Sequence, residues 1–224
     1  QDEFCYHEMI AHVPVLAHGA VRDVLIIGGG DGGALRDVLR HRTVERATMV
    51  EIDGSVVELS RKYLPGLSDG AFDDPRTDLV IGDGLEYVKN ADRKFDVIIV
   101  DSTDPIGPAT PLFSDAFYTD CRNILTDDGI VVCQSGVSFV QPEEAQATYA
   151  RMQRLFPDPA LYLAQVPTYA FGYMTLGWGA NSDRARTTDL ATIRKRFEEA
   201  RIETRYYTPE IHVASFSLPA YMKY

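Results

Sequence analysis

Residues 24–33 read Val24-Leu25-Ile26-Ile27-Gly28-Gly29-Gly30-Asp31-Gly32-Gly33, a β-branched apolar run followed at once by a glycine-rich turn. The apolar run predicts a buried strand, and the spacing from Leu35 to Leu39 predicts a helix after the turn. Such a turn between a strand and a helix lets a cofactor approach the backbone amides, and Gly28 and Gly30 are the expected contacts. A tight turn without a ligand would explain one or two of these glycines. The stretch therefore favours a Rossmann-like cofactor site.

The rest of the chain repeats this alternation of short apolar runs and amphipathic stretches, which is typical of a parallel sheet covered by helices on both faces. Strands are predicted at 24–27, 48–51, 78–81, 95–100 and 130–133, with later strands at 160–166 and 173–177 joined by Pro167-Thr168-Tyr169. Helices are predicted at 35–39, 56–63, 85–89, 117–125, 145–155 and 190–200. The expected fold class is α/β, with a doubly wound sheet.

Composition narrows the class of protein. A chain of 224 residues that is 45% hydrophobic is long enough to bury a sizeable core as one main domain. The net charge of −11, from 33 acidic and 22 basic residues, argues against a nucleic-acid partner. No apolar run of about 18 residues occurs, and the acidic start does not resemble a signal peptide, so we expect a cytoplasmic protein without a membrane partner.

The three cysteines, Cys5, Cys121 and Cys133, lack the CxxC or His-paired spacing of metal sites. Cys121 and Cys133 fall in an expected helix and an expected core strand. The sequence therefore predicts buried, reduced thiols, and no metal centre.

Asp31 is the informative residue of the glycine-rich turn. Dinucleotide sites and ordinary S-adenosylmethionine sites accept a pyrophosphate or a carboxylate near this loop, and an aspartate would repel both. It would instead attract an ammonium group. The turn thus points to a ligand that carries a positive charge where the common cofactors carry a negative one.

Two further acidic positions follow expected strands. Glu51 ends the second strand, where Rossmann-like folds place an acidic residue that binds both ribose hydroxyls; Asp53 is read as a surface or cap residue. Asp83 and Gly84 follow the third strand, where an acceptor could bind the exocyclic amine of adenine. An Asp-Gly turn that only caps a helix would explain the same pair.

The strongest signal is Asp101-Ser102-Thr103-Asp104-Pro105-Ile106-Gly107-Pro108, directly after the most hydrophobic expected strand. Ligands of open α/β sheets gather at the carboxyl ends of strands, so Asp101 and Asp104 are expected to face the cofactor. Two unit cations about 4 Å apart repel by on the order of 4 kcal/mol at an effective dielectric near 20. Paired carboxylates would offset this repulsion between a sulfonium and an ammonium, and one could accept the proton of the attacking amine.

Taken together, these motifs resemble the spermidine synthases, polyamine aminopropyltransferases of the bacterial type. The resemblance covers nearly the whole chain and includes residues 2–4 and 6–9, the glycine-rich turn, 50–53, 82–84, 101–108, 167–169, 206–207 and 211–212. It implies a fold of the S-adenosylmethionine-dependent methyltransferase type, mostly parallel with an antiparallel edge strand. It also implies transfer of the aminopropyl group of decarboxylated S-adenosylmethionine, a co-substrate, to putrescine or a similar polyamine, with no prosthetic group and as a homodimer or homotetramer.

The resemblance assigns roles that the residues alone leave open. Asp101 would be the catalytic base and Asp31 the ligand of the aminopropyl ammonium. Glu51 would bind the ribose, Asp83 and Gly84 the adenine, and Pro108 would line the adenosyl pocket. The polyamine slot would comprise Tyr6, His7, Asp31, Asp101, Asp104 and Tyr169. Without the resemblance, Tyr6 and His7 would more often be read as structural.

The same resemblance implies a small N-terminal β-stranded domain, to which nothing in this sequence corresponds. Residues 1–22 are therefore expected to be a segment that links such a domain to a catalytic domain at 23–224. Two other functions are compatible with the motifs: a small-molecule methyltransferase that uses intact S-adenosylmethionine, and a non-catalytic module that binds polyamines or nucleosides.

Overall fold

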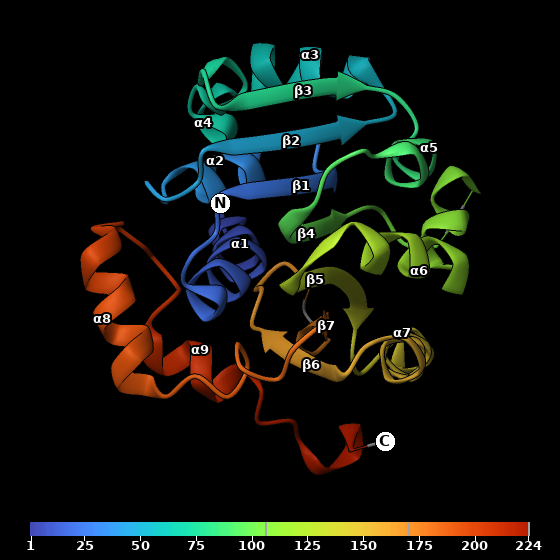
Figure 1. Ribbon diagram of the computed structural model, residues 1–224, viewed down its shortest axis with the longest axis vertical. Coiled ribbons are helices and arrows are strands. Elements are labelled where there is room, and N and C mark those ends of the chain that lie inside the picture. The colour runs from blue at the N-terminus through green and yellow to red at the C-terminus, as the bar shows by residue number, and fades with distance from the viewer. Residues whose placement is uncertain (106, 170, 224) are drawn as a thin grey trace.

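The protein is an α/β sandwich in the computed structural model, which describes residues 1–105, 107–169 and 171–223, the side chain of Pro108 excepted (Figure 1). One seven-stranded sheet runs through the described residues in the order β3-β2-β1-β4-β5-β7-β6. Its strands are β1 (Asp23–Gly28), β2 (Arg46–Glu51), β3 (Thr77–Ile81), β4 (Phe95–Asp101), β5 (Leu125–Val137), β6 (Asp158–Ala164) and β7 (Met174–Ala180). Each overlaps a strand expected from the sequence.

The pairing is parallel from β3 through β5, and β7 runs antiparallel to both β5 and β6. The antiparallel pairings therefore lie at one edge, as predicted, with β7 inserted between β5 and the outermost strand β6. Strand β5 is longer than predicted, because pairing continues on both sides of 130–133. The predicted doubly wound fold class is confirmed.

Helices cover both faces of the sheet. They are α1 (Phe4–His18), α2 (Gly33–Leu39), α3 (Gly54–Tyr63), α4 (Pro65–Ser68), α5 (Gly84–Asn90), α6 (Asp115–Ile124), α7 (Pro142–Leu155), α8 (Leu190–Ala200) and α9 (Pro209–Ser215), with 3₁₀ turns η1 (Ala71–Asp73), η2 (Gly107–Phe113) and η3 (Ala220–Met222). In Figure 1, α1, α8 and α9 lie on one side of the sheet, and α5, α6 and α7 on the other. Two hydrophobic cores result, one on each face.

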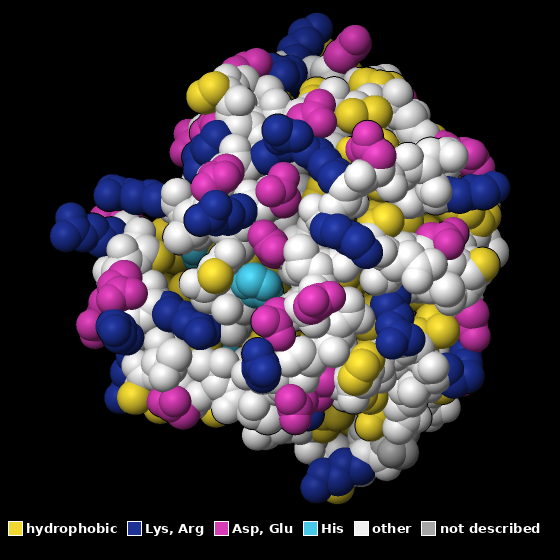
Figure 2. Space-filling model, viewed as in Figure 1, with side chains coloured by type: hydrophobic (Ala, Val, Ile, Leu, Met, Phe, Trp, Pro, Cys, Tyr) yellow, Lys and Arg dark blue, Asp and Glu magenta, His cyan; other side chains and the backbone are white. Residues whose placement is uncertain are grey.

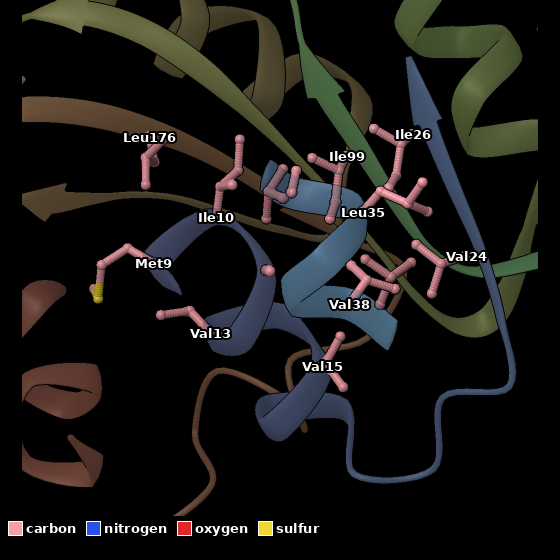
Figure 3. Packing of buried hydrophobic residues seen from close by; sticks show 14 of the residues in the cluster. Met9, Ile10, Val13, Val15, Val24, Ile26, Leu35, Val38, Ile99 and Leu176 are labelled. Carbon is pink, nitrogen blue, oxygen red and sulfur yellow. The ribbon is translucent and has the colours of Figure 1, made fainter. Parts of the chain in front are cut away.

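Helix α1 was not expected as a helix. It is apolar on nearly all sides and contains Pro14, so it lacks the amphipathic period that reveals a surface helix. Met9, Ile10 and Val13 of α1 are fully buried in one of the two cores. Figure 3 shows Ile10 pointing toward the strands, whereas Met9 and Val13 project from the side of α1 that faces away from α2. This burial fixes the start of α1, and with it Tyr6 and His7, against the sheet. The division of the chain at residue 22 stays a prediction.

The surface carries both charge signs. On the face shown in Figure 2, acidic and basic side chains are interspersed and form no single basic patch. The three cysteines are buried and free, as predicted. In the described part of the chain, no helix has both the length and the apolar character that crossing a bilayer requires.

Candidate active site

A cavity of about 1190 Å³ opens where β1, β2, β4 and β5 end. This edge contains the point between β1 and β4 where the strand order reverses, the usual ligand site of open α/β sheets. Among the described residues, the lining includes eight carboxylic side chains, no Lys or Arg, and one histidine, His7. The carboxylic residues are Asp2, Glu3, Asp31, Glu51, Asp53, Asp83, Asp101 and Asp104. The electrostatic character of the cavity is therefore that of a cation site.

The glycine-rich turn lies directly beside the end of β4. Gly28 pairs with Asp101 in the sheet register and has a φ of 82°, and a Cβ there would lie 2.3 Å from the Asp101 carbonyl oxygen. The Gly29 N–H donates to that oxygen at 2.9 Å. At Gly30, a Cβ would lie 2.8 Å from Oε2 of Glu51. A side chain at Gly28 would therefore clash with the backbone of Asp101, and one at Gly30 with the Glu51 carboxylate.

Asp31 of the glycine-rich turn lines the cavity, and its side chain is 37% exposed. Its Oδ1 accepts a hydrogen bond from the Gly33 N–H at 2.8 Å, and Oδ2 lies 3.5 Å from Nε2 of His7. The carboxylate is thus oriented by the start of α2, and the partly exposed side chain lines the cavity. This geometry suits an incoming ammonium group.

Glu51 and Asp83 stand at the ends of β2 and β3. Glu51 is buried, and its Oε1 accepts from the Asp53 N–H at 3.0 Å. Asp53 caps α3 through Ser55, as predicted. Asp83 caps α5, because its Oδ1 accepts from the Leu85 N–H at 2.8 Å, yet it also lines the cavity beside Gly84. Asp83 can therefore cap α5 and also contact a ligand in the cavity.

Asp101 is the carboxylate at the centre of the cavity edge, and the Tyr6 hydroxyl donates to its Oδ1 at 2.7 Å. Burial raises the pKa of Asp101, and Asp31 and Glu51 raise it further, whereas His7 and the Tyr6 hydrogen bond act in the opposite direction. Burial and the neighbouring Asp101 hold the pKa of Tyr6 well above its usual value. Tyr6 therefore stays a phenol that donates, and Asp101 is a stronger base than an exposed aspartate.

His7 is buried between two carboxylates on either side of its ring. Its Nδ1 lies 2.7 Å from Glu3 Oε2, which also accepts from Arg36 at 3.1 Å. Burial by itself would lower the pKa of His7, but Glu3, Asp31 and Asp101 together raise it. The His7 hydrogen bond and Arg36 in turn lower the pKa of Glu3 to about 2. Protonation of His7 is thus favoured by the carboxylates on both sides of its ring.

The far part of the cavity holds Asp104, Tyr169 and the pair Asp2–Thr168. Asp104 accepts from the side-chain amides of Gln134 at 3.3 Å and Gln141 at 2.9 Å. Asp2 Oδ2 accepts from both the backbone N–H and the hydroxyl of Thr168 at 2.6 Å, which ties the N-terminal residues to the loop before Tyr169. Burial raises the pKa of Tyr169, as do Asp101, Asp104 and Asp2.

Comparison with known proteins matches this chain to a family model described as the spermine/spermidine synthase domain, over residues 3–189. The chain belongs to the spermine/spermidine synthase family. It is 57% identical to the polyamine aminopropyltransferase of a Ruegeria species and 55% identical to polyamine aminopropyltransferase 1 of Pseudomonas aeruginosa. These alignments cover 99% of this chain and 78% and 77% of the two relatives.

Solved structures of the family agree. A spermidine synthase in complex with the transition-state analogue AdoDATO superposes with a TM-score of 0.93 at 42% identity, covering 99% of this chain and 75% of that one. The spermidine synthase from Thermotoga maritima gives a TM-score of 0.88 at 40% identity, covering 99% and 73%. The predicted family and the predicted class of enzyme, an aminopropyltransferase, are confirmed.

The structure brings the family's expected site residues to one cavity. Tyr6, His7, Gly28, Gly30, Asp31, Glu51, Asp83, Gly84, Asp101, Asp104 and Tyr169 all line it. The side chain of Pro108 lies outside what the structure describes. Within the described ranges, no group of three or more His, Cys, Asp or Glu side chains could hold a metal ion.

Sequence reasoning missed Gln134, Gln141, Asp2 and Thr168, all of which line the cavity. Gln134 carried a usable signal, since it follows Cys133 toward the carboxyl end of an expected strand. Gln141 carried no such signal, because the neighbouring sequence does not predict the turn that brings it to the cavity.

Proposed function

We propose that this chain transfers the aminopropyl group of decarboxylated S-adenosylmethionine to putrescine, giving spermidine and 5′-methylthioadenosine. One observation carries the proposal: eight carboxylic side chains and no Lys or Arg line the cavity in the part of the chain that the structure describes. Both substrates are cations, and their mutual repulsion is the electrostatic obstacle to the reaction. Family membership supports the same activity.

The reaction is an in-line displacement at the aminopropyl carbon attached to sulfur. The amine lone pair forms the new N–C bond as the C–S bond breaks, and the sulfonium leaves as a neutral thioether. A primary amine near neutral pH is almost entirely ammonium, so it must lose a proton before it can attack. Asp101 is the proposed acceptor of that proton, supported by its central position and by the burial that raises its pKa.

The nucleoside half of the cavity, defined as Gly28, Gly30, Glu51, Asp83 and Gly84, is proposed to hold the adenosyl group. Glu51 would bind the ribose hydroxyls, and Asp83 with Gly84 would bind adenine. Pro108 is also proposed to line the adenosyl pocket, on the family resemblance. Asp31, at the border with the rest of the cavity, would hold the aminopropyl ammonium, and the partial exposure of its side chain supports this role.

The amine half, defined as Tyr6, His7, Asp101, Asp104 and Tyr169, is proposed to hold putrescine. Tyr6 orients Asp101 through its 2.7 Å hydrogen bond. His7 fixes Asp31, and Asp104 and Tyr169 would bind along the alkyl chain and its amines. Catalysis would then come from positioning and from stabilisation of positive charge by fixed carboxylates.

The family resemblance also supports three proposals about the protein in the cell. They are assembly as a homodimer or homotetramer, a cytoplasmic location, and a small N-terminal β domain ahead of residues 1–22. Light scattering on the purified protein would test the assembly.

The direct test is a turnover assay with decarboxylated S-adenosylmethionine and saturating putrescine, read out as 5′-methylthioadenosine. The proposal predicts stoichiometric spermidine and thioadenosine. Methylated amine and S-adenosylhomocysteine formed from intact S-adenosylmethionine would instead indicate a methyltransferase. Heat of binding without any product would indicate a binding module.

A further inference from the structure

The carboxylate of Asp104 is held by two neutral amides. Gln134 Nε2 lies 3.3 Å from its Oδ1, and Gln141 Nε2 lies 2.9 Å from its Oδ2. Gln134 is buried, and all three side chains line the cavity. Among the described residues, each carboxylate oxygen therefore receives a single side-chain donor and keeps acceptor capacity for a ligand.

The orientation of both amides is fixed by the backbone. Gln134 Oε1 accepts from the Gly136 N–H at 3.0 Å, and Gln141 Oε1 accepts from the Val137 N–H at 2.9 Å. Rotating either amide by 180° would place N–H against N–H and oxygen against the carboxylate. Both nitrogens must therefore face Asp104.

The loop is shaped around Gln141. Gly136 has a φ of 72°, and a Cβ there would lie 2.9 Å from Gln141 Oε1. Gln141 occupies the residue before α7, but its side chain makes no capping hydrogen bond. It reaches into the cavity instead, which a purely helix-forming role does not require.

Neutral donors have a specific electrostatic consequence. Elsewhere in the described chain, the buried acids Asp37 and Asp158 are paired with arginine, which cancels their charge. No such cation is among the described residues that line the cavity around Asp104. Amides orient the carboxylate while leaving its full negative charge available to a cationic ligand.

We infer that Gln141, together with Gln134, is a positioning residue that fixes Asp104 as an anchor for an ammonium group of the acceptor amine. The inference rests on the proposed aminopropyl transfer. It assigns the amide pair to the affinity and selectivity for the acceptor, and not to the binding of the nucleoside. A carboxylate held in one orientation loses less conformational entropy on binding, and this raises affinity for the acceptor.

The test is a double-mutant cycle on the intact protein with putrescine as the acceptor. Gln141→Leu should raise the KM for putrescine roughly ten-fold, as expected for losing one hydrogen bond to a charged group, and should change the KM for decarboxylated S-adenosylmethionine less than about two-fold. In an Asp104→Asn background, Gln141→Leu should change the putrescine KM less than about two-fold. The matched control is Gln153→Leu, at an exposed position on α7 that does not line the cavity.

A second variant distinguishes the hydrogen bond from Gln141 to Asp104 from the role of Gln141 in holding the loop. Gln141→Glu keeps an oxygen for the Val137 N–H but replaces the donor with a carboxyl group, which would share a proton with Asp104. The putrescine KM of this variant should then depend on pH more strongly than that of the wild type. Equal effects of Gln141→Leu with and without Asp104, or a Gln141→Glu variant with the pH dependence of the wild type, would overturn the inference. A wild-type protein that forms no thioadenosine would instead overturn the proposed function.

Discussion

The nucleoside half of the cavity draws its residues from the ends of β1 and β2 and from the segments that directly follow β1 and β3. The amine half gathers side chains from α1, from the end of β4 and from the loops after β4 and β6. In the first half, short local motifs and backbone conformation set the shape, as at Gly28 with its φ of 82°. In the second half, contacts between distant segments set it, as in the hydrogen bond from Tyr6 to Asp101. The nucleoside half is thus locally encoded, and the amine half depends on the completed fold.

The largest expected effect is on kcat, from a substitution in the amine half that should leave binding in the nucleoside half unchanged. Asp101→Asn removes the proposed proton acceptor and should lower kcat by about 10²–10⁴-fold, the usual contribution of a general base. The KM for decarboxylated S-adenosylmethionine should change less than about three-fold. Steady-state kinetics check both values, with Asp92→Asn at an exposed loop position as the control. Near-normal turnover would remove Asp101 as the base.

An intermediate effect should be confined to the nucleoside half. Glu51→Gln weakens the proposed charged hydrogen bonds to the ribose and should raise the KM for decarboxylated S-adenosylmethionine by roughly 10-fold or more. The KM for putrescine should stay within about two-fold. Glu58→Gln, at an exposed position on α3 that does not line the cavity, is the matched control and should leave both KM values unchanged. A putrescine KM that rises together with the nucleoside KM would show that the two halves are not separable.

The smallest effect concerns the pH profile of the amine half. Asp101 must be ionised to accept a proton, so activity is lost as pH falls through its raised pKa. The Tyr6 hydrogen bond lowers that pKa, so Tyr6→Phe should move the acid limb of kcat to higher pH. Tyr63→Phe, at an exposed position, should leave the limb in place. An acid limb unchanged in the Tyr6 variant would mean that Asp101 does not govern it.

The same division explains what the sequence could predict. The sheet strands carry β-branched runs, so their existence, and the carboxylates just after them, followed from periodicity and from the rule that ligands gather at strand ends. Glu51, Asp101 and Asp104 were found in this way, and all line the cavity.

The features that were missed depend on tertiary contacts. Helix α1 is buried nearly all round and so shows no amphipathic period, which hid the element that carries Tyr6 and His7. Gln141 meets Asp104 only because the loop after β5 turns back at Gly136, which has a φ of 72°. The pairing of Asp2 with Thr168 joins residues 166 positions apart. Periodicity and local turn chemistry carry no information on such long-range contacts.

The central claim is that fixed carboxylates, with Asp31 at the glycine-rich turn, select cationic substrates. Calorimetric binding of decarboxylated and intact S-adenosylmethionine, to the wild type and to Asp31→Asn, tests it most directly. Because a carboxylate beside Asp31 should cost several kcal/mol, we predict that the wild type binds the decarboxylated form at least about 100-fold more tightly and that Asp31→Asn loses most of this preference. Equal affinity of the wild type for the two forms would contradict the account.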